Sequence, residues 1–367
     1  MTLMNKSSNG RGERLDRLWI ANLHGGTTPT DRISDYGQPA ECPIKPNRWG
    51  AQRQCDEKEN IMRLVAAFVF CGAVLMLATA AGAQEIDWQK VDNGFGRKPA
   101  VVSGDVHRYG FPRTDLNVTL DGVTIKPALA LGGWIAFKPI QAQAMAMMTT
   151  GEAMAMGDLV LLESEINPVM IKLIENGIEI TAVHNHLLRA NPATFYLHVG
   201  GRGDPVKMAT AIHTALAASK TPLEAPAAAA TPPAIDLDTA QLDQIIGGKG
   251  QANGGVYQFA VPRRDPVTEA GMMITPVGPL GVATAFGFQP TGGGKAAITG
   301  DFVLTSDEVN PVIKALRSNG IEMTALHSHM LDEQPRLFFM HFWANDDAVK
   351  LAKGLRAALD KMANAKS

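Results

Sequence analysis

The sequence predicts an α+β fold that occurs twice in tandem. Residues 157–217 align without a gap with residues 300–360, with 27 identical residues in 61, and internal similarity of this extent indicates a duplicated domain. Within each copy the hydrophobic pattern changes between the strand and helix periods in the order β-α-β-β-α, and a part rich in β-hairpin patterns precedes it. Each repeat is therefore predicted to be an antiparallel-rich sheet with helices, of about 130 residues, which is an ordinary domain size.

The second half of repeat one shows these elements in order. Asn176-Gly177 is typical of a helix end. At the start of that helix, Asn167 before Pro168 predicts an N-cap with proline at the first helical position, and Ser164 is an alternative start. The predicted elements are a strand at 158–162, a helix at 168–175, strands at 178–188 and 194–200, and a helix at 205–217 that follows Asp204.

The first half of repeat one is predicted to contain strands alone. Residues 116–120 and 123–127 alternate in hydrophobicity around Asp121-Gly122, a turn that favours a tight hairpin. After this half comes the Met-, Ala- and Gln-rich stretch 141–156, which repeat two shortens to a glycine-rich turn. We expect a surface loop there, because methionine more often fills gaps than binds metal.

Residues 1–83 differ from the rest of the chain. Met62-Arg63, the apolar run 64–77 and the small residues up to Ala83 have the order of a secretory signal. The apolar run is short for a transmembrane helix, which needs roughly 20 residues. We therefore expect a signal peptide at 62–83 and a periplasmic or secreted mature protein. Residues 1–61 are polar and lack periodicity, and we expect them to be a non-native or disordered extension.

A Pro- and Ala-rich segment separates the two repeats. Residues 220–234 read KTPLEAPAAAATPPA, a composition typical of a semi-stiff linker. This segment places repeat one at 85–219 and repeat two at 235–367.

Composition after residue 83 excludes several classes of site and partner. All three cysteines of the chain precede that point, so the mature chain is expected to contain no disulfide, thiolate metal site or cysteine nucleophile. Residues 84–367 hold 24 Lys plus Arg against 28 Asp plus Glu, a net charge of −4, without a basic cluster. That balance argues against nucleic acid as a partner.

Each repeat carries the same histidine pattern, His-x-His followed by a third histidine after eleven intervening residues. Side chains two apart on a strand share a face, so the first two imidazoles point the same way. A turn centred on residue 191 would place His198 opposite His184 and Tyr196 opposite His186. The equivalent register in repeat two would place His341 opposite His327 and Phe339 opposite His329. Three imidazoles would then converge in each hairpin.

Three imidazoles on a half-buried face cannot all be protonated without mutual repulsion and desolvation, so sharing a metal ion is an economical account. Three histidines with an open position are typical of catalytic zinc, and imidazole also suits copper, iron, nickel or manganese. Glu165 and Glu308 recur near the start of the helix expected to pack on the sheet, as candidate general bases or fourth ligands. The predicted metal ligands are His184, His186, His198, His327, His329 and His341.

Other interpretations remain open for these motifs. The histidines could form a metal-free acid–base or ligand pocket, or they could be structural. Arg113 with Asp115, and Arg263 with Asp265, could line a pocket for an anion or form salt bridges at strand ends.

Several segments resemble a known family. GDLVLLESEINPV, NGIEITAVHNHLL and FYLHVGG, with their second copies GDFVLTSDEVNPV, NGIEMTALHSHML and FFMHFWA, resemble the LppY/LpqO family of exported bacterial proteins, built on domain of unknown function 1259. The resemblance covers nearly all of the chain after the predicted signal peptide. It implies export, a tandem domain and no established activity. Some members are lipoproteins, and this chain lacks a convincing lipid-attachment cysteine.

The sequence thus predicts an exported protein with a His-rich metal site in each repeat, with zinc as the expected metal. Metal-activated water would act on a cell-envelope or small polar substrate. The alternative is a non-catalytic ligand-binding or scaffold module of the envelope.

Overall fold

Two similar six-stranded antiparallel sheets organise the computed structural model, which describes residues 85–141, 149–224 and 234–363. These residues belong to one compact unit, Ala81–Ser367. The predictions for 1–61 and 62–83, and the middle of the linker, lie outside the described residues.

The strand order is the same in both sheets, which confirms the α+β fold and the duplication. In repeat one it is β1 (Val101–Ser103), β2 (Val106–Pro112), β5 (Gly132–Gln141), β6 (Thr149–Leu162), β8 (Thr194–Gly203) and β7 (Glu179–His184). In repeat two it is β9 (Gln251–Asn253), β10 (Val256–Pro262), β13 (Ala283–Gly292), β14 (Lys295–Leu304), β16 (Phe338–Asp347) and β15 (Glu322–His327). Strands β7 and β15, which end at His184 and His327, are thus edge strands of their sheets.

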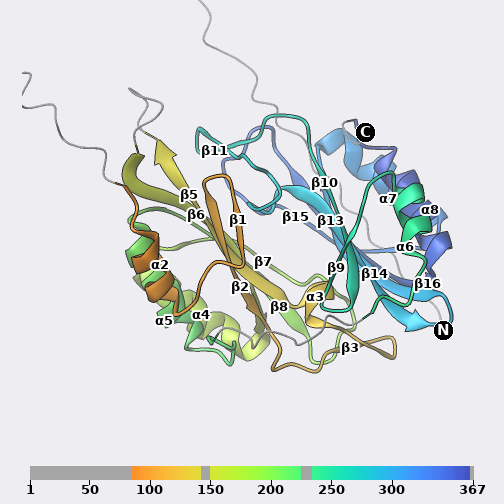
Figure 1. The fold of residues 1–367 in the computed structure, drawn as a ribbon, viewed down its shortest axis with the longest axis horizontal. Coiled ribbons are helices and arrows are strands. Elements are labelled where there is room, and N and C mark those ends of the chain that lie inside the picture. The colour runs from red at the N-terminus through yellow and green to blue at the C-terminus, as the bar shows by residue number, and fades with distance from the viewer. Residues whose placement is uncertain (1–84, 142–148, 225–233, 364–367) are drawn as a thin grey trace, which may run out of the picture. The chain divides into compact units, whose positions relative to one another are not determined.

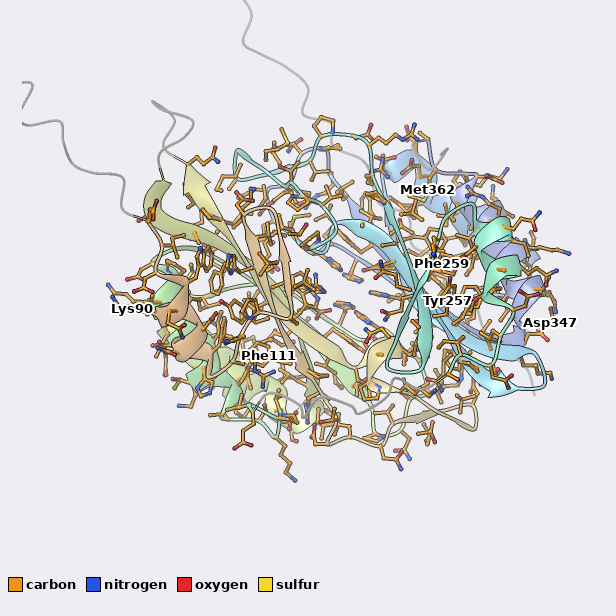
Figure 2. The ribbon with its side chains drawn as sticks, in the orientation of Figure 1. Lys90, Phe111, Tyr257, Phe259, Asp347 and Met362 are labelled. Atoms are coloured by element: carbon orange, nitrogen blue, oxygen red, sulfur yellow. The ribbon has the colours of Figure 1, made fainter. Side chains whose placement is uncertain are left out.

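Helices cover one face of each sheet (Figure 1). They are α2 (Trp88–Phe95), α4 (Glu163–Glu175) and α5 (Pro205–Leu216) in repeat one, and α6 (Thr239–Ile246), α7 (Ser306–Ser318) and α8 (Ala348–Leu359) in repeat two. Each set encloses a core of its own. In Figure 2, Phe111 lies in the first of these cores, and Tyr257 and Phe259 lie in the second, where they pack with residues of α6 and α8.

The opposite faces of the two sheets pack against each other. Two mixed clusters contain buried residues from both repeats: Met156 lies with Phe339 in one, and Val160 and Tyr196 lie with Trp343 in the other. Alternation along the strands explains this, because even-numbered residues of β6 and β8 face repeat two, and odd-numbered residues face the helices. The interface between repeats is therefore hydrophobic too, in addition to the core of each repeat.

Short elements connect the sheets. The predicted turn Asp121-Gly122 joins β3 (Thr119–Leu120) to β4 (Val123–Thr124) with positive φ at both turn residues, as a type I′ hairpin requires. The short helix α3 (Pro127–Ala130) follows, and the corresponding hairpin of repeat two is β11 (Thr268–Glu269) with β12 (Met272–Met273).

Three predictions about elements were wrong. The first halves are not all strand, because α2 and α6 open the two repeats. The helix α4 begins at Glu163, with Pro168 inside it, because the Glu165 carboxylate accepts the backbone N–H of Leu162 and so satisfies the helix start five residues earlier. Residues 149–156, predicted as loop, belong to β6, because Thr149 pairs with β5 and residues 153–156 pair with both β5 and β8.

The hairpin register also differs from the prediction. His198 pairs with Ala182, and His184 with Tyr196. In repeat two, His341 pairs with Ala325, and His327 with Phe339. The predicted His184–His198 pairing fails because β7 ends at His184 and a long connection follows, whose Asn191 bridges to Thr119 and is therefore not the centre of a tight turn.

In the part of the chain that the structure describes, no helix has both the length and the apolarity needed to cross a membrane.

Candidate metal centre

All six predicted histidines meet in one cluster between the repeats, and not in two separate sites. His184 stacks on His327 with ring centroids 3.5 Å apart. Beside that central pair, His186 stacks on His341 at 3.6 Å, and His198 stacks on His329 at 3.8 Å. Every one of these stacks joins a ring of one repeat to a ring of the other.

The cluster has an approximate twofold arrangement. A shift of 143 residues turns the His186–His341 stack into the His329–His198 stack, and returns the central pair to itself. Hydrogen bonds follow the same relation. Thr181 Oγ1 donates to the carbonyl of His329 at 2.6 Å, and Thr324 Oγ1 donates to the carbonyl of His186 at 2.5 Å. Each repeat therefore positions the histidines of the other.

Two aspartates join the histidines. Asp158 on β6 pairs across the sheet with His198, and Asp301 on β14 pairs with His341. Asp158 oxygens lie 3.8 Å from His198 Nε2 and 4.0 Å from His186 Nε2. Asp301 oxygens lie 3.5 Å from His329 Nε2 and 3.7 Å from His341 Nδ1.

Donor atoms in the cluster are close enough to share an ion. Three groups have one potential ligand atom per residue, all within 4.8 Å of one another. The first is Asp158 with His186 and His198; the second is Asp301 with His327, His329 and His341; the third is His184, His186, His327 and His341. The first two groups are nearly symmetry-related sets of one carboxylate and two or three imidazoles, a ligand type that transition metals accept.

Burial sets the charge state of these groups. Desolvation lowers the pKa of all six imidazoles, with that of His327 at about 4 and that of His341 at about 3. Desolvation also raises the pKa of Asp158 to about 8, against the opposing charge of Arg108, and raises that of Asp301. The histidines are thus neutral near pH 7, the form in which imidazole binds metal.

A backbone contact fixes the tautomer of His341. His341 Nδ1 donates to the carbonyl of Gly300 at 2.8 Å, which leaves its Nε2 lone pair facing His327 Nε2, also at 2.8 Å. The buried atoms without a hydrogen-bond partner include both ring nitrogens of His184, the Nε2 atoms of His186, His198 and His329, and one oxygen each of Asp158 and Asp301. Buried polar atoms are rarely left unpaired in proteins, so this concentration of unpaired atoms makes the cluster a candidate ligand site.

Comparison with known proteins gives a family and no activity. A family profile described as "Domain of Unknown Function (DUF1259)" matches residues 89–218 and again residues 240–361. The chain belongs to this family. It contains two tandem DUF1259 domains, in agreement with the resemblance of the repeated segments. No curated protein matches the chain.

One solved structure matches the tandem DUF1259 chain weakly. It is a crystal structure of a trimeric bacterial microcompartment shell protein, PduB, at 16% identity, covering 71% of this chain and 89% of that chain, with a TM-score of 0.17.

Glu165 and Glu308, the two glutamates predicted as general bases or fourth ligands, are not members of the three ligand groups. Glu165 accepts hydrogen bonds from Arg113 Nη1 at 2.6 Å, from Leu162 N and from Lys220 N. Glu308 makes the matching contacts with Arg263, Thr305 N and Ala363 N. Both are buried ion pairs that tie the start of a helix to the sheet and to the C-terminal end of the domain, and both arginines also pair with Asp115 or Asp265.

Sequence reasoning missed Asp158 and Asp301. A signal was present, because both stand in matched Gly-Asp pairs that open the aligned segments, GDLV and GDFV. Their relation to the histidines depends on the pairing of β6 with β8 and of β14 with β16, which the local pattern does not give. A cavity of about 150 Å³, lined by residues that include Met154, Met156, Thr181 and Glu269, has His329 of the cluster in its wall.

Proposed function

We propose that the histidine–aspartate cluster is a transition-metal site built jointly by the two DUF1259 domains. Asp158, His186 and His198 form one ligand set, and Asp301, His329 and His341 form the other; His184 and His327 lie between them. The observation that carries the proposal is the convergence of buried donor atoms that have no hydrogen-bond partner within the described residues. A metal ion would satisfy several of them at once.

The donor types narrow the choice of metal. Two imidazoles and one carboxylate, with positions left open, suit zinc and also the iron(II) of non-haem enzymes. Zinc remains the first expectation, because it binds such sets without a redox partner. Each set draws on a single domain, and the carbonyl bonds from Thr181 and Thr324 tie its histidine backbone to the opposite domain.

The proposed chemistry is hydrolysis by metal-activated water, because a bound divalent metal lowers the pKa of water from 15.7 to about 7. The substrate class is a small polar molecule or a cell-envelope component. This setting rests on the expected signal peptide at 62–83, and the corresponding location is the periplasm or the exterior of the cell. Activity at the cluster would depend on Asp158 or Asp301, since the oxygens of Glu165 and Glu308 are engaged by arginines and backbone N–H groups.

The decisive experiment is metal analysis of untagged protein. We expect bound zinc or iron after purification, removal of that metal by a chelator, and a rise in melting temperature when Zn²⁺ is returned, because a ligand of the native state stabilises it by mass action. His186→Ala and His329→Ala are expected to lower the metal content. His213→Ala is the matched control, because His213 lies on α5 outside the cluster. Absence of metal together with no thermal response to zinc, iron, manganese or copper rejects the proposal.

The competing function is a non-catalytic scaffold or ligand-binding module with structural histidines. The stacks between repeats favour it, because they already join the two domains. The triple variant His184→Ala, His186→Ala, His198→Ala separates the two functions. A metal site predicts that the metal-free fold survives and metal uptake is lost, whereas a structural role predicts a large loss of stability without any metal present.

A further inference from the structure

The two halves of the cluster differ in what covers their aspartates. In repeat one, Trp134 on β5 is the direct cross-strand neighbour of Asp158. In repeat two, the neighbour of Asp301 at the equivalent position is Ala285 on β13. Side chains of directly paired residues lie on the same face of the sheet and in contact range. The carboxylate of Asp158 therefore has an indole beside it, and the carboxylate of Asp301 has only a methyl group.

Neighbouring positions enlarge this difference. Arg108 lies over the Trp134 ring at 3.8 Å and donates to the carbonyl of Pro279 at 2.7 Å, and Met156 pairs with the strand beside them. The equivalents of Arg108 and Met156 in repeat two, judged by strand register, are Gln258 and Thr299. Gln258 keeps the bond to the other repeat, since it donates to the carbonyl of Ala128. Repeat two therefore lacks the indole ring of Trp134 and the sulfur-containing side chain of Met156.

A cavity of about 420 Å³ results in repeat two. Its lining includes Gln258, Ala260, Ala285, Gly287 and Thr299 on the face of the sheet that meets repeat one, with Leu129 of α3 above them. Helix α3 lies against β13 and β14 there (Figure 1). This volume is in the range of small-molecule sites, about 300–1,000 Å³. The side chain of Asp301 is 20% exposed, against 10% for Asp158, as expected if the cavity opens toward Asp301.

We infer that this cavity is the ligand pocket of the cluster, that it serves the Asp301 half alone, and that it takes a small organic acid with one carboxylate. Lys249 is the one charged side chain among the described residues that line the cavity, and it is exposed at the edge of the sheet. Gln251, Gln258 and Thr299 share the remaining wall with leucine, alanine, phenylalanine and glycine residues. A single cation suits a monoanion better than a multiply charged ligand.

Unpaired donor atoms next to the cavity wall support this assignment, because Asp301 pairs directly with Ala285 and follows Gly300, and both of these residues line the cavity. Asp301 has one buried oxygen without a hydrogen-bond partner, and His329 has an unpaired Nε2 within 3.5 Å of the Asp301 carboxylate. The inference rests on the proposed function, because a metal held there would bind the carboxylate of the ligand. The Asp158 half, sealed by Trp134, would hold its metal without a ligand pocket.

Cobalt(II) provides a test, because its visible spectrum responds when an acid enters the site. Full-length protein is loaded with Co²⁺ and titrated with butyrate and benzoate. We expect a saturable spectral change in the wild type, and loss of that change in Ala285→Trp, which copies the repeat-one seal, at concentrations that saturate the wild type. Cobalt stoichiometry and circular dichroism show whether that variant is folded and loaded. Trp134→Ala, which leaves the repeat-two pocket intact, should keep the response.

A surface variant keeps the test informative if Ala285→Trp does not fold. Lys249→Glu is expected to weaken benzoate binding by roughly fivefold, which is the scale of an exposed ion pair lost and reversed. Lys98→Glu, at the end of the corresponding segment of repeat one, should not change benzoate binding. A cobalt spectrum that neither acid changes overturns the pocket inference and leaves the metal site standing, and so does a response to inorganic phosphate alone. Failure of the wild type to take up cobalt or zinc overturns the metal site itself.

Discussion

His184 of repeat one stacks on His327 of repeat two with ring centroids 3.5 Å apart. These residues are equivalent in the two repeats, so their contact marks the approximate twofold relation of the two domains. The stack needs both repeats, because each of them supplies one of its two rings.

The stability of the metal-free protein should fall as pH is lowered from about 6.5 to about 4.5. The pKa of each cluster imidazole is lower in the folded state than its unfolded value of about 6.5, so in this window the unfolded chain binds more protons. One such histidine changes the free energy of unfolding by about 1.4 kcal/mol per pH unit at most. Melting curves of chelator-treated protein at several pH values measure the effect.

The two aspartates act in the opposite direction in that window. Their pKa is raised by burial, so they stabilise the fold at low pH and lose that contribution as pH rises toward about 8 for Asp158. Six histidines outweigh two aspartates between pH 4 and 6.5, so the net slope follows the histidines. A melting temperature that is flat or rises on acidification would falsify this assignment of neutral histidines.

Thr181→Val should weaken metal binding without unfolding the protein. The Thr181 hydroxyl donates to the carbonyl of His329 across the repeat interface, and valine has nearly the same shape without that donor. Loss of one such bond costs about 1 kcal/mol of stability, and loss of a contact that orients a metal ligand lowers affinity by about 10–100-fold. Calorimetric titration with Zn²⁺ measures the affinity, and thermal or urea unfolding measures the stability.

A matched control exists on helix α5. Thr210→Val removes a hydroxyl that bonds within its own helix, to the carbonyl of Val206, far from the interface contacts. It should leave zinc affinity unchanged. Equal zinc affinities for wild type and Thr181→Val would show that the threonine bond does not position the site.

Glu165→Ala should lower the free energy of unfolding by about 3–5 kcal/mol, the range for breaking a buried ion pair. Arg113 is fully buried and pairs with Glu165 at 2.6 Å, so the truncation leaves a buried guanidinium with Asp115 as its remaining carboxylate. Bound metal per chain should not change, because Glu165 lies outside the ligand groups. Denaturant unfolding and metal analysis report these quantities. A stable variant with lost metal or lost metal-dependent activity would instead support Glu165 as the ligand or base that the sequence suggested.

Gly300→Ala should destabilise the protein by at least about 1–3 kcal/mol, because a Cβ there would overlap the backbone carbonyl of Ala285 and the Cα of Phe286. The carbonyl of Gly300 also holds the His341 ring, so metal affinity should decrease as well. Gly278→Ala is the control, since a Cβ at that position meets no atom within 4 Å. Comparable melting temperatures for the two variants would contradict the close approach of β13 and β14.

Local patterns in the sequence were sufficient for some of these features. Identity between the copies predicts two equivalent domains, and Asp121-Gly122 predicts the β3–β4 hairpin, because turn chemistry is a local property. The histidine spacing correctly places His184 and His198 in one hairpin. Its exact register was wrong by two residues, since the long connection after β7 carries no local signal for its length or path.

Other features depend on contacts that no short segment encodes. The stacking of His184 on His327 requires two sheets to meet face to face, and the place of Asp158 beside His198 requires the pairing of β6 with β8. Glu165 recurs in both copies, as a catalytic residue would, yet its partner is Arg113, 52 positions earlier. Identity between the two repeats therefore pointed to buried polar residues, but it did not distinguish a residue in an ion pair from a metal ligand.

The difference between Trp134 and Ala285 at equivalent positions suggests an advantage of having both domains in one chain. A homodimer of a single repeat would carry the same residue at both positions, so both halves of its site would be sealed or both would be open. Fusion into one polypeptide removes that constraint and also keeps the two halves at a high effective concentration, independent of protein dilution. Covalent duplication thus allows one ligand set to specialise in holding the assembly together while its twin remains accessible.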